Sequence, residues 1–138
     1  MIFANETAYR FEKLNDQDTL LFSWKPAPGV DPALFRRAIS GFARLCKEHR
    51  PSRGVIDAQD LDQSSSAFAW LRGSEEDQLE SYDAWWAREV LPVYVQAKLD
   101  KLAVVTGDPS APGEIPVPNN TAQFRMGYFH SLQDALSW

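Results

Sequence analysis

The sequence predicts an α/β fold, with one mixed, mainly parallel sheet, an N-terminal antiparallel hairpin and helices packed on the sheet. Two short apolar runs carry this prediction, residues 54–57 and residues 101–106, because each follows a segment with helical spacing of its apolar residues. Strands that alternate with helices usually build a parallel or mixed sheet that those helices cover. A chain of 138 residues can bury roughly two thirds of its unfolded surface, so we expect one domain over residues 1–138.

An antiparallel hairpin is predicted before the first helix. Residues 9–14 alternate apolar with charged side chains, as a half-solvated edge strand does. Residues 15–18 are the polar turn formers Asn, Asp, Gln and Asp, and residues 19–24 return to a β-type composition. Because three apolar residues are consecutive in this second strand, we expect it to be covered on both faces.

A long helix is predicted after the hairpin. Asp31 followed by Pro32 marks its start, because an Asp side chain accepts from free backbone N–H groups and proline suits the first helical position. The pair Arg50 and Pro51 predicts its end near His49. Between these limits apolar residues recur at three- and four-residue steps, and they are Phe35, Ala38, Ile39, Phe42, Leu45 and Cys46.

The second half of the chain predicts another helix, a proline-rich loop, a last strand and a short helix. The helical spacing begins at Glu75, and Pro92 should kink or split this helix. Residues 108–123 hold four prolines and two adjacent asparagines, so we expect no regular structure there. Residues 124–129 form the last strand, and Ser131 is the expected cap of the closing helix.

Charge and hydropathy exclude two classes of partner. A net charge of −5 argues against nucleic acid, because nucleic-acid-binding proteins gather Lys and Arg on one face. The chain holds no apolar run long enough to span a bilayer and no basic leader before an apolar segment. We therefore expect a cytoplasmic protein without membrane insertion. The one cysteine, Cys46, falls on the apolar side of the first predicted helix and should be a buried hydrophobic residue.

The order of predicted elements resembles that of the STAS-like domains, which include SpoIIAA-like anti-sigma factor antagonists. Three segments carry the resemblance: Gly54-Val55-Ile56-Asp57, the stretch from Trp85 to Val105, and the ending from Tyr128 to Trp138, which is similar to the aromatic-Phe-Asp-Ser-Leu ending of such proteins. The resemblance implies a SpoIIAA-like sheet and a non-enzymatic regulatory or protein-interaction module with no cofactor.

The antagonist branch of this family is phosphorylated on a serine after an Asp at the head of a helix. Here Asp62 and Gln63 precede the run of Ser64, Ser65 and Ser66, which are the corresponding candidates. The family's glycine after the serine pair is absent, since an alanine follows the serines. The alternative is that these serines form a polar loop or a helix cap.

Carboxylates follow two of the predicted strands. In an open parallel sheet, ligands bind beyond the carboxyl ends of the strands, where Asp57 and Asp108 should meet. Two carboxylates there can hold Mg²⁺, so one alternative function is a metal-dependent hydrolase that uses both. Asp60, in the loop after the first of these strands, is a further binding candidate. The simpler interpretation is that such aspartates cap turns or face water.

The two histidines, His49 and His130, have no ligand residue at zinc spacing, so no metal site is predicted. No coherent catalytic set is evident in the sequence. We therefore assign no residue as catalytic.

Aromatic residues gather in the middle of the chain, among them Trp70, Trp85 and Trp86. Successive helical residues lie about 100° apart, so we expect that Trp85 and Trp86 cannot both point into one core. One of them should face a partner, a pocket or the proline-rich loop. This favours a protein partner or self-association as a homodimer. The alternative is that the domain's own loop covers both indoles. If the loop opens, the same surface would instead admit a small apolar or lipid-like ligand.

Overall fold

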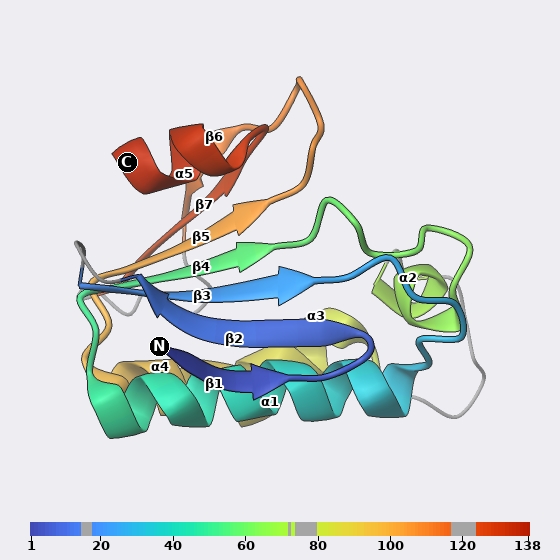
Figure 1. The fold of residues 1–138 in the computed structure, drawn as a ribbon, viewed down its shortest axis with the longest axis horizontal. Helices are drawn as coiled ribbons and strands as arrows, with labels where there is room; N and C mark the ends of the chain where they lie inside the picture. The colour runs from blue at the N-terminus through green and yellow to red at the C-terminus, as the bar shows by residue number, and fades with distance from the viewer. Residues whose placement is uncertain (15–17, 72, 74–79, 117–123) are drawn as a thin grey trace.

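A seven-stranded mixed sheet with helices on both faces forms the fold, as seen in a computed structural model (Figure 1). The structure describes residues 1–14, 18–71, 73, 80–116 and 124–138. The strand order is β1-β2-β3-β4-β5-β7-β6. The strands are β1 (Ile2–Asn5), β2 (Tyr9–Leu14), β3 (Thr19–Trp24), β4 (Arg53–Asp57), β5 (Lys101–Val105), β6 (Gly113–Ile115) and β7 (Arg125–Phe129).

The centre of the sheet is parallel and its two sides are antiparallel. Strands β3, β4, β5 and β7 pair in parallel. The pairs β1–β2, β2–β3 and β6–β7 are antiparallel. The predicted hairpin is therefore confirmed as β2 and β3, and the two apolar runs of the prediction are adjacent strands, with Val55 opposite Ala103 and Ile56 opposite Val104.

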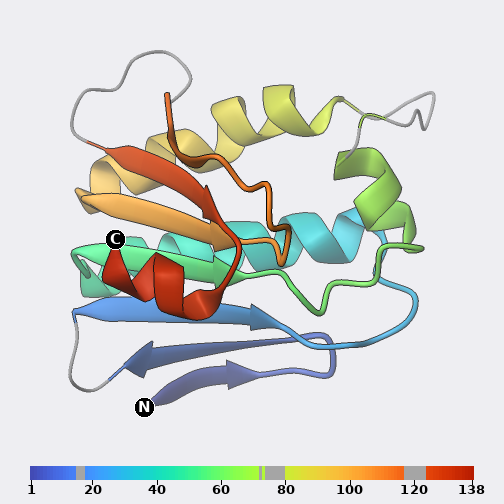
Figure 2. The ribbon, with the colours of Figure 1, turned by 90° about the horizontal axis from the view of Figure 1, so that it is seen from above.

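Helices cover the two faces of the sheet unequally (Figures 1 and 2). The larger core lies on the face covered by α1 and by the helical segment from α3 to α4, while α5 covers part of the other face over a small core. Helix α2 lies near the carboxyl ends of the parallel strands. The helices are α1 (Pro32–His49), α2 (Ser66–Leu71), α3 (Tyr82–Trp85), the π-helix η1 (Trp86–Val90), α4 (Leu91–Ala97) and α5 (Leu132–Ser137).

Helix α1 has the limits that its capping residues predict. The Leu34 N–H donates to Asp31 Oδ1 at 2.8 Å, and Pro32 is the first helical residue. Arg50 ends the helix in a left-handed conformation, with φ 48°, and its N–H donates to the Cys46 carbonyl at 2.8 Å. This cap satisfies a terminal carbonyl and turns the chain toward β4.

The second helical segment differs from its prediction at its start. Helix α3 begins at Tyr82, because the Ser81 side chain caps it by accepting from the Ala84 N–H at 3.2 Å. The expected start at Glu75 lies outside the described residues. Pro92 is accommodated by a change of helix type: the Leu91 N–H donates to the Trp86 carbonyl, five residues earlier, before α4 resumes.

The proline-rich stretch contains a strand that was not predicted. Gly113–Ile115 forms β6 and pairs with the outer edge of β7, with Gly113 opposite Tyr128 and Ile115 opposite Met126. The expectation of no regular structure across residues 108–123 is therefore wrong for these three residues, which lie between two prolines and contain none themselves. The remainder of the stretch from 117 to 123 lies outside the described residues.

Among the described residues, no helix combines the length and apolar character that a bilayer span requires.

Candidate functional site

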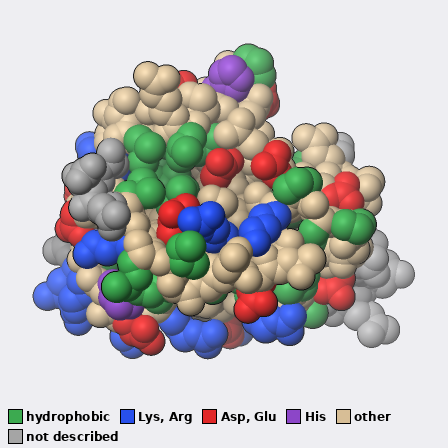
Figure 3. All heavy atoms as spheres, in the orientation of Figure 1, with side chains coloured by type: hydrophobic (Ala, Val, Ile, Leu, Met, Phe, Trp, Pro, Cys, Tyr) green, Lys and Arg blue, Asp and Glu red, His purple; other side chains and the backbone are tan. Residues whose placement is uncertain are grey.

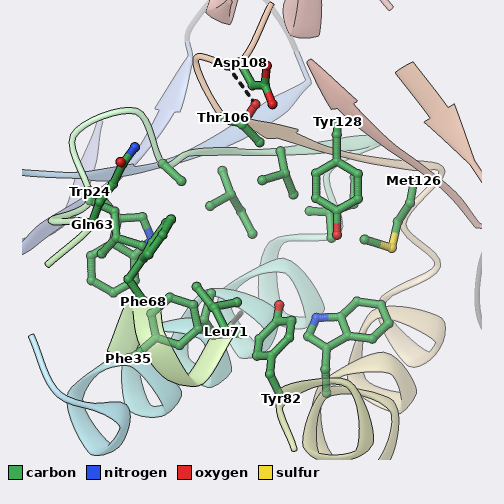
Figure 4. A pocket seen from close by; sticks show the side chains of 17 residues that line it. Trp24, Phe35, Gln63, Phe68, Leu71, Tyr82, Thr106, Asp108, Met126 and Tyr128 are labelled. Atoms are coloured by element: carbon green, nitrogen blue, oxygen red, sulfur yellow. Dashed lines mark hydrogen bonds between the residues drawn. The ribbon is translucent and has the colours of Figure 1, made fainter. Parts of the chain in front are cut away.

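A cavity of about 340 Å³ lies between the sheet and the helices that cover its larger core (Figure 4). We call it the sheet–helix cavity. Its sheet wall is formed by the inward side chains of four strands, Trp24, Ile56, Leu102, Val104, Met126 and Tyr128. Its helical wall comes from α1, α2, α3 and η1, and consists of Phe35, Ile39, Phe68, Leu71, Tyr82 and Trp86.

The parallel register explains why these strand residues share one face. Ile56 lies opposite Val104, and Val104 lies opposite Tyr128, so the three form one row across β4, β5 and β7. Leu102 and Met126 form a second row two residues earlier. Because side chains alternate between the faces of a strand, both rows point toward the helices. The cavity is therefore walled by side chains from distant parts of the sequence.

Two tyrosine hydroxyls provide polar groups inside the cavity. In Figure 4, Tyr82 from α3 and Tyr128 from β7 point their hydroxyls toward one another. Neither hydroxyl has a hydrogen-bond partner in the described part of the chain. Burial raises the pKa of Tyr82, with Tyr128 and Asp83 adding to the rise. The pKa of Tyr128 is raised for the same first reason, and Asp83 contributes again. Both phenols thus stay protonated and can donate to or accept from a ligand.

The cavity reaches solvent at Asp108, an exposed residue that also lines it. The Oδ1 atom of Asp108 accepts from the Ser110 N–H at 2.9 Å and from the Ser110 hydroxyl at 2.8 Å, and these bonds lower the pKa of this carboxyl. The Asp108 N–H donates to Thr106 Oγ1 at 3.1 Å. Gly107, between them, has φ 77°, a conformation that favours glycine. The turn therefore holds Asp108 in place.

Asp57 lies at the same edge of the sheet as Asp108 but on the other face. The two strand exits are joined by a hydrogen bond from the Ala58 N–H to the Val105 carbonyl at 2.9 Å. Since Ile56 lines the cavity, the next residue, Asp57, points to the opposite face. Asp57 Oδ1 accepts from the backbone N–H and the side-chain amide of Gln59, both at 3.2 Å. The prediction of a shared edge is confirmed, but only Asp108 lines the cavity.

The remaining carboxylate candidate, Asp60, is exposed in the loop after β4. Within the described residues, no group of three or more His, Cys, Asp or Glu side chains is close enough to share a metal ion. Asp57 and Asp108, the pair that the hydrolase alternative would use, lie on different faces of the sheet.

Trp85 and Trp86, one of which was expected to face a partner, a pocket or the proline-rich loop, are both buried. Trp85 and Trp86 are 5% and 6% exposed and belong to the same core, so the expectation that they cannot both be buried in it is wrong. The reason is that the two indoles pack against different neighbours within this core. Trp85 contacts Trp70 of α2 with ring centroids 5.6 Å apart, whereas Trp86 faces Tyr94 and the cavity. Trp70 donates its indole N–H to the Glu80 carbonyl at 2.8 Å.

The serine run forms the start of α2. Ser65 is buried, and its hydroxyl donates to the Asp62 carbonyl at 2.6 Å and accepts from the Phe68 N–H at 3.1 Å. Ser64 is exposed and donates to Asp62 Oδ1 at 2.7 Å, which lowers the pKa of that carboxyl. Ser66 is exposed as the first helical residue. Ser65 thus has the capping role that the sequence left open as an alternative to phosphorylation.

Sequence reasoning missed most of the cavity. It singled out Trp86 and Asp108 but not Tyr82, Tyr128 or Met126 as wall residues. The alternation of Met126 and Tyr128 within the last strand was a usable signal for a shared face, although their facing helix could not be inferred from it.

Comparison of the chain with known protein families, with curated proteins and with solved structures found no match.

Proposed function

We propose that this protein binds a small, largely apolar molecule in the sheet–helix cavity. The observation that carries the proposal is the cavity of about 340 Å³, which follows one face of the sheet and is also lined by residues just beyond the carboxyl ends of β4 and β5. Small-molecule sites typically occupy roughly 300–1,000 Å³ and combine apolar walls with a few polar groups. Open parallel sheets bind their ligands at this same edge.

The cavity wall supports binding better than catalysis. The Asp108 carboxyl has a lowered pKa and is held by Ser110, which makes it a poor proton donor near neutral pH. The hydroxyls of Tyr82 and Tyr128 have raised pKa values and therefore form the phenolate nucleophile less readily. The resemblance to STAS-like domains supports placing this binding in a regulatory or interaction module, whose partner the ligand would control.

The proposal is tested with the intact chain and a neutral apolar dye. Nile red should bind with increased fluorescence, and Ala58→Phe should weaken its binding at least about tenfold, because Ala58 lines the cavity and the new ring fills it. The matched control is Ala84→Phe, the same change at an exposed residue of α3, which should leave binding unchanged. Equal binding by the wild type and Ala58→Phe would overturn the proposal.

Native mass spectrometry of the protein purified from cells offers a second measurement. A retained adduct that is absent from Ala58→Phe would support occupancy of the cavity. An adduct of the same abundance in both proteins would place the molecule elsewhere and argue against this site.

A further inference from the structure

We propose that the sheet–helix cavity selects apolar molecules that carry a protonated amine, with the ammonium group at Asp108. This inference rests on the proposed function and names the chemical class of its ligand. It follows from the charges of the residues that line the cavity and from the Asp108 carboxylate, whose Oδ2 atom accepts from no described residue.

The charge at the cavity wall is negative. Among the described lining residues, Asp108 carries the only full charge, and none is Lys, Arg or His. The carboxylate of Asp83 adds to the raised pKa of both Tyr82 and Tyr128, so its negative field also reaches the cavity. A carboxylate ligand would lose its hydration there without gaining a cationic partner. The wall therefore disfavours fatty acids and other anionic amphiphiles.

The basic side chains of the same strands lie on the opposite face of the sheet. Arg53, Lys101 and Arg125 form one row across β4, β5 and β7. They gather around the last residue, Trp138: Arg53 donates to its carbonyl at 3.1 Å, and the cationic groups of Lys101 and Arg125 are 5.5 Å from its ring centroid. The sheet thus separates these three positive charges from the cavity.

Asp108 has a free oxygen for an ammonium group. Both hydrogen bonds from Ser110 go to Oδ1, and Oδ2 accepts from no described residue. His130 also acts on the Asp108 carboxyl and helps to lower its pKa, but it does not line the cavity. A charge-assisted hydrogen bond from an ammonium group to Oδ2 would leave the turn intact.

The interior suits the remainder of such a ligand. The aromatic side chains of Trp24, Tyr82, Trp86 and Tyr128 line the interior and can pack against an apolar body. The two tyrosine hydroxyl oxygens can accept from a second polar group. An apolar amine can therefore pack its body against the apolar lining and donate from its ammonium group to Asp108.

The test uses three probes with the same ten-carbon chain: decylamine, decanol and decanoate. At about pH 7 their head groups are positive, neutral and negative. Calorimetry, checked by quenching of tryptophan fluorescence, should show decylamine binding at least about tenfold more tightly than decanoate, with decanol between them. Asp108→Asn keeps an oxygen for the Ser110 bonds but removes the charge. In this variant the ratio of the affinity for decylamine to that for decanoate should fall to about threefold or less.

A charge control separates Asp108 from the overall negative charge. Glu48→Gln removes one unit of charge at the other end of α1, where the residue is exposed, and should preserve the wild-type ratio. A second variant, Gln63→Lys, places a cation on the cavity wall and should raise the affinity for decanoate at least about fivefold.

The possible outcomes distinguish the two proposals. If none of the three probes binds, the proposed function fails. If decanol binds in the cavity while decanoate binds as tightly as decylamine, the cavity stands and the selection of amines is overturned. If the wild-type preference survives unchanged in Asp108→Asn, the assignment of the ammonium site to Asp108 is wrong.

Discussion

Val104 and Val105 are adjacent in β5 and have opposite surroundings. Val104 lines the sheet–helix cavity, whereas Val105 is fully buried in the small core beneath α5, which it shares with Val55 and Ala135. The same valine side chain thus borders open space on one face of the sheet and close-packed atoms on the other. The space-filling view in Figure 3 shows hydrophobic side chains gathered near α5, with charged side chains around them.

This contrast predicts that the same substitution destabilises the protein much less at Val104 than at Val105. Val104→Phe should change the free energy of unfolding by less than about 1 kcal/mol, because the ring enters the cavity. Val105→Phe should lower it by about 1–3 kcal/mol, because that core has no space for the added atoms. Urea denaturation measures both changes. An equal loss in the two variants would contradict an open cavity at Val104.

The elements with strong local signals could be predicted from the sequence. Asp31 with Pro32 and Ser131 cap their helices as expected. The edge strands β1 and β6 were not predicted because each is short and depends on a neighbouring strand for its hydrogen bonds. A helix that runs continuously from Glu75 is contradicted at Glu80 and Ser81, which are not helical: the apolar spacing in the sequence continues backward past Ser81, but the Ser81 cap decides that α3 begins at Tyr82.

The site was less predictable than the fold, because it depends on pairing between distant segments. The sequence placed Asp57 and Asp108 at one edge, and that placement is confirmed. The two carboxylates lie on different faces because side chains alternate along a strand, so the face depends on how many residues separate each Asp from the last inward-facing strand residue. The hydroxyls of Tyr82 and Tyr128 point toward one another because of how α3 is placed relative to β7. No local sequence pattern specifies that placement.

Arg53 joins β4 to the last turn of α5, and we expect it to stabilise the fold. Its guanidinium donates to Thr19 Oγ1 at 3.1 Å, to the Leu136 carbonyl at 2.6 Å and to the Trp138 carbonyl at 3.1 Å. A lysine cannot reproduce this branched geometry, so Arg53→Lys should lower the free energy of unfolding by about 1–3 kcal/mol. The measurement is urea denaturation.

The matched control for this prediction is Arg44→Lys, at an exposed position of α1, which should stay within about 0.5 kcal/mol of the wild type. Equal stability of Arg53→Lys and Arg44→Lys would show that the contacts of Arg53 contribute nothing to folding.

Tyr94 carries a buried hydroxyl that has no hydrogen-bond partner among the described residues. Its ring is fully buried and stacks on Phe124 with centroids 5.7 Å apart. Tyr94→Phe keeps the ring and removes only the unpaired group, so the free energy of unfolding should stay unchanged or rise by up to about 1 kcal/mol. Thermal and urea denaturation test this. A loss above about 1 kcal/mol would reveal a partner for the hydroxyl, such as a buried water.

Because the Cys46 thiol is buried, we expect the free energy of unfolding to fall at alkaline pH. Burial raises the pKa of its thiol from 9.0 to about 12, so the folded state keeps the proton that the unfolded chain releases above about pH 9. The unfolded state then binds fewer protons, and the free energy of unfolding should fall by up to about 1.4 kcal/mol per pH unit between these values. Urea denaturation at about pH 8, 9 and 10 should show a shallower slope in Cys46→Ala. Burial also raises the pKa of Tyr82 and Tyr94, so the free energy of unfolding of Cys46→Ala should still fall with pH above about pH 10. An identical slope in both proteins, or rapid reaction of the native thiol with a disulfide reagent, would contradict burial of Cys46.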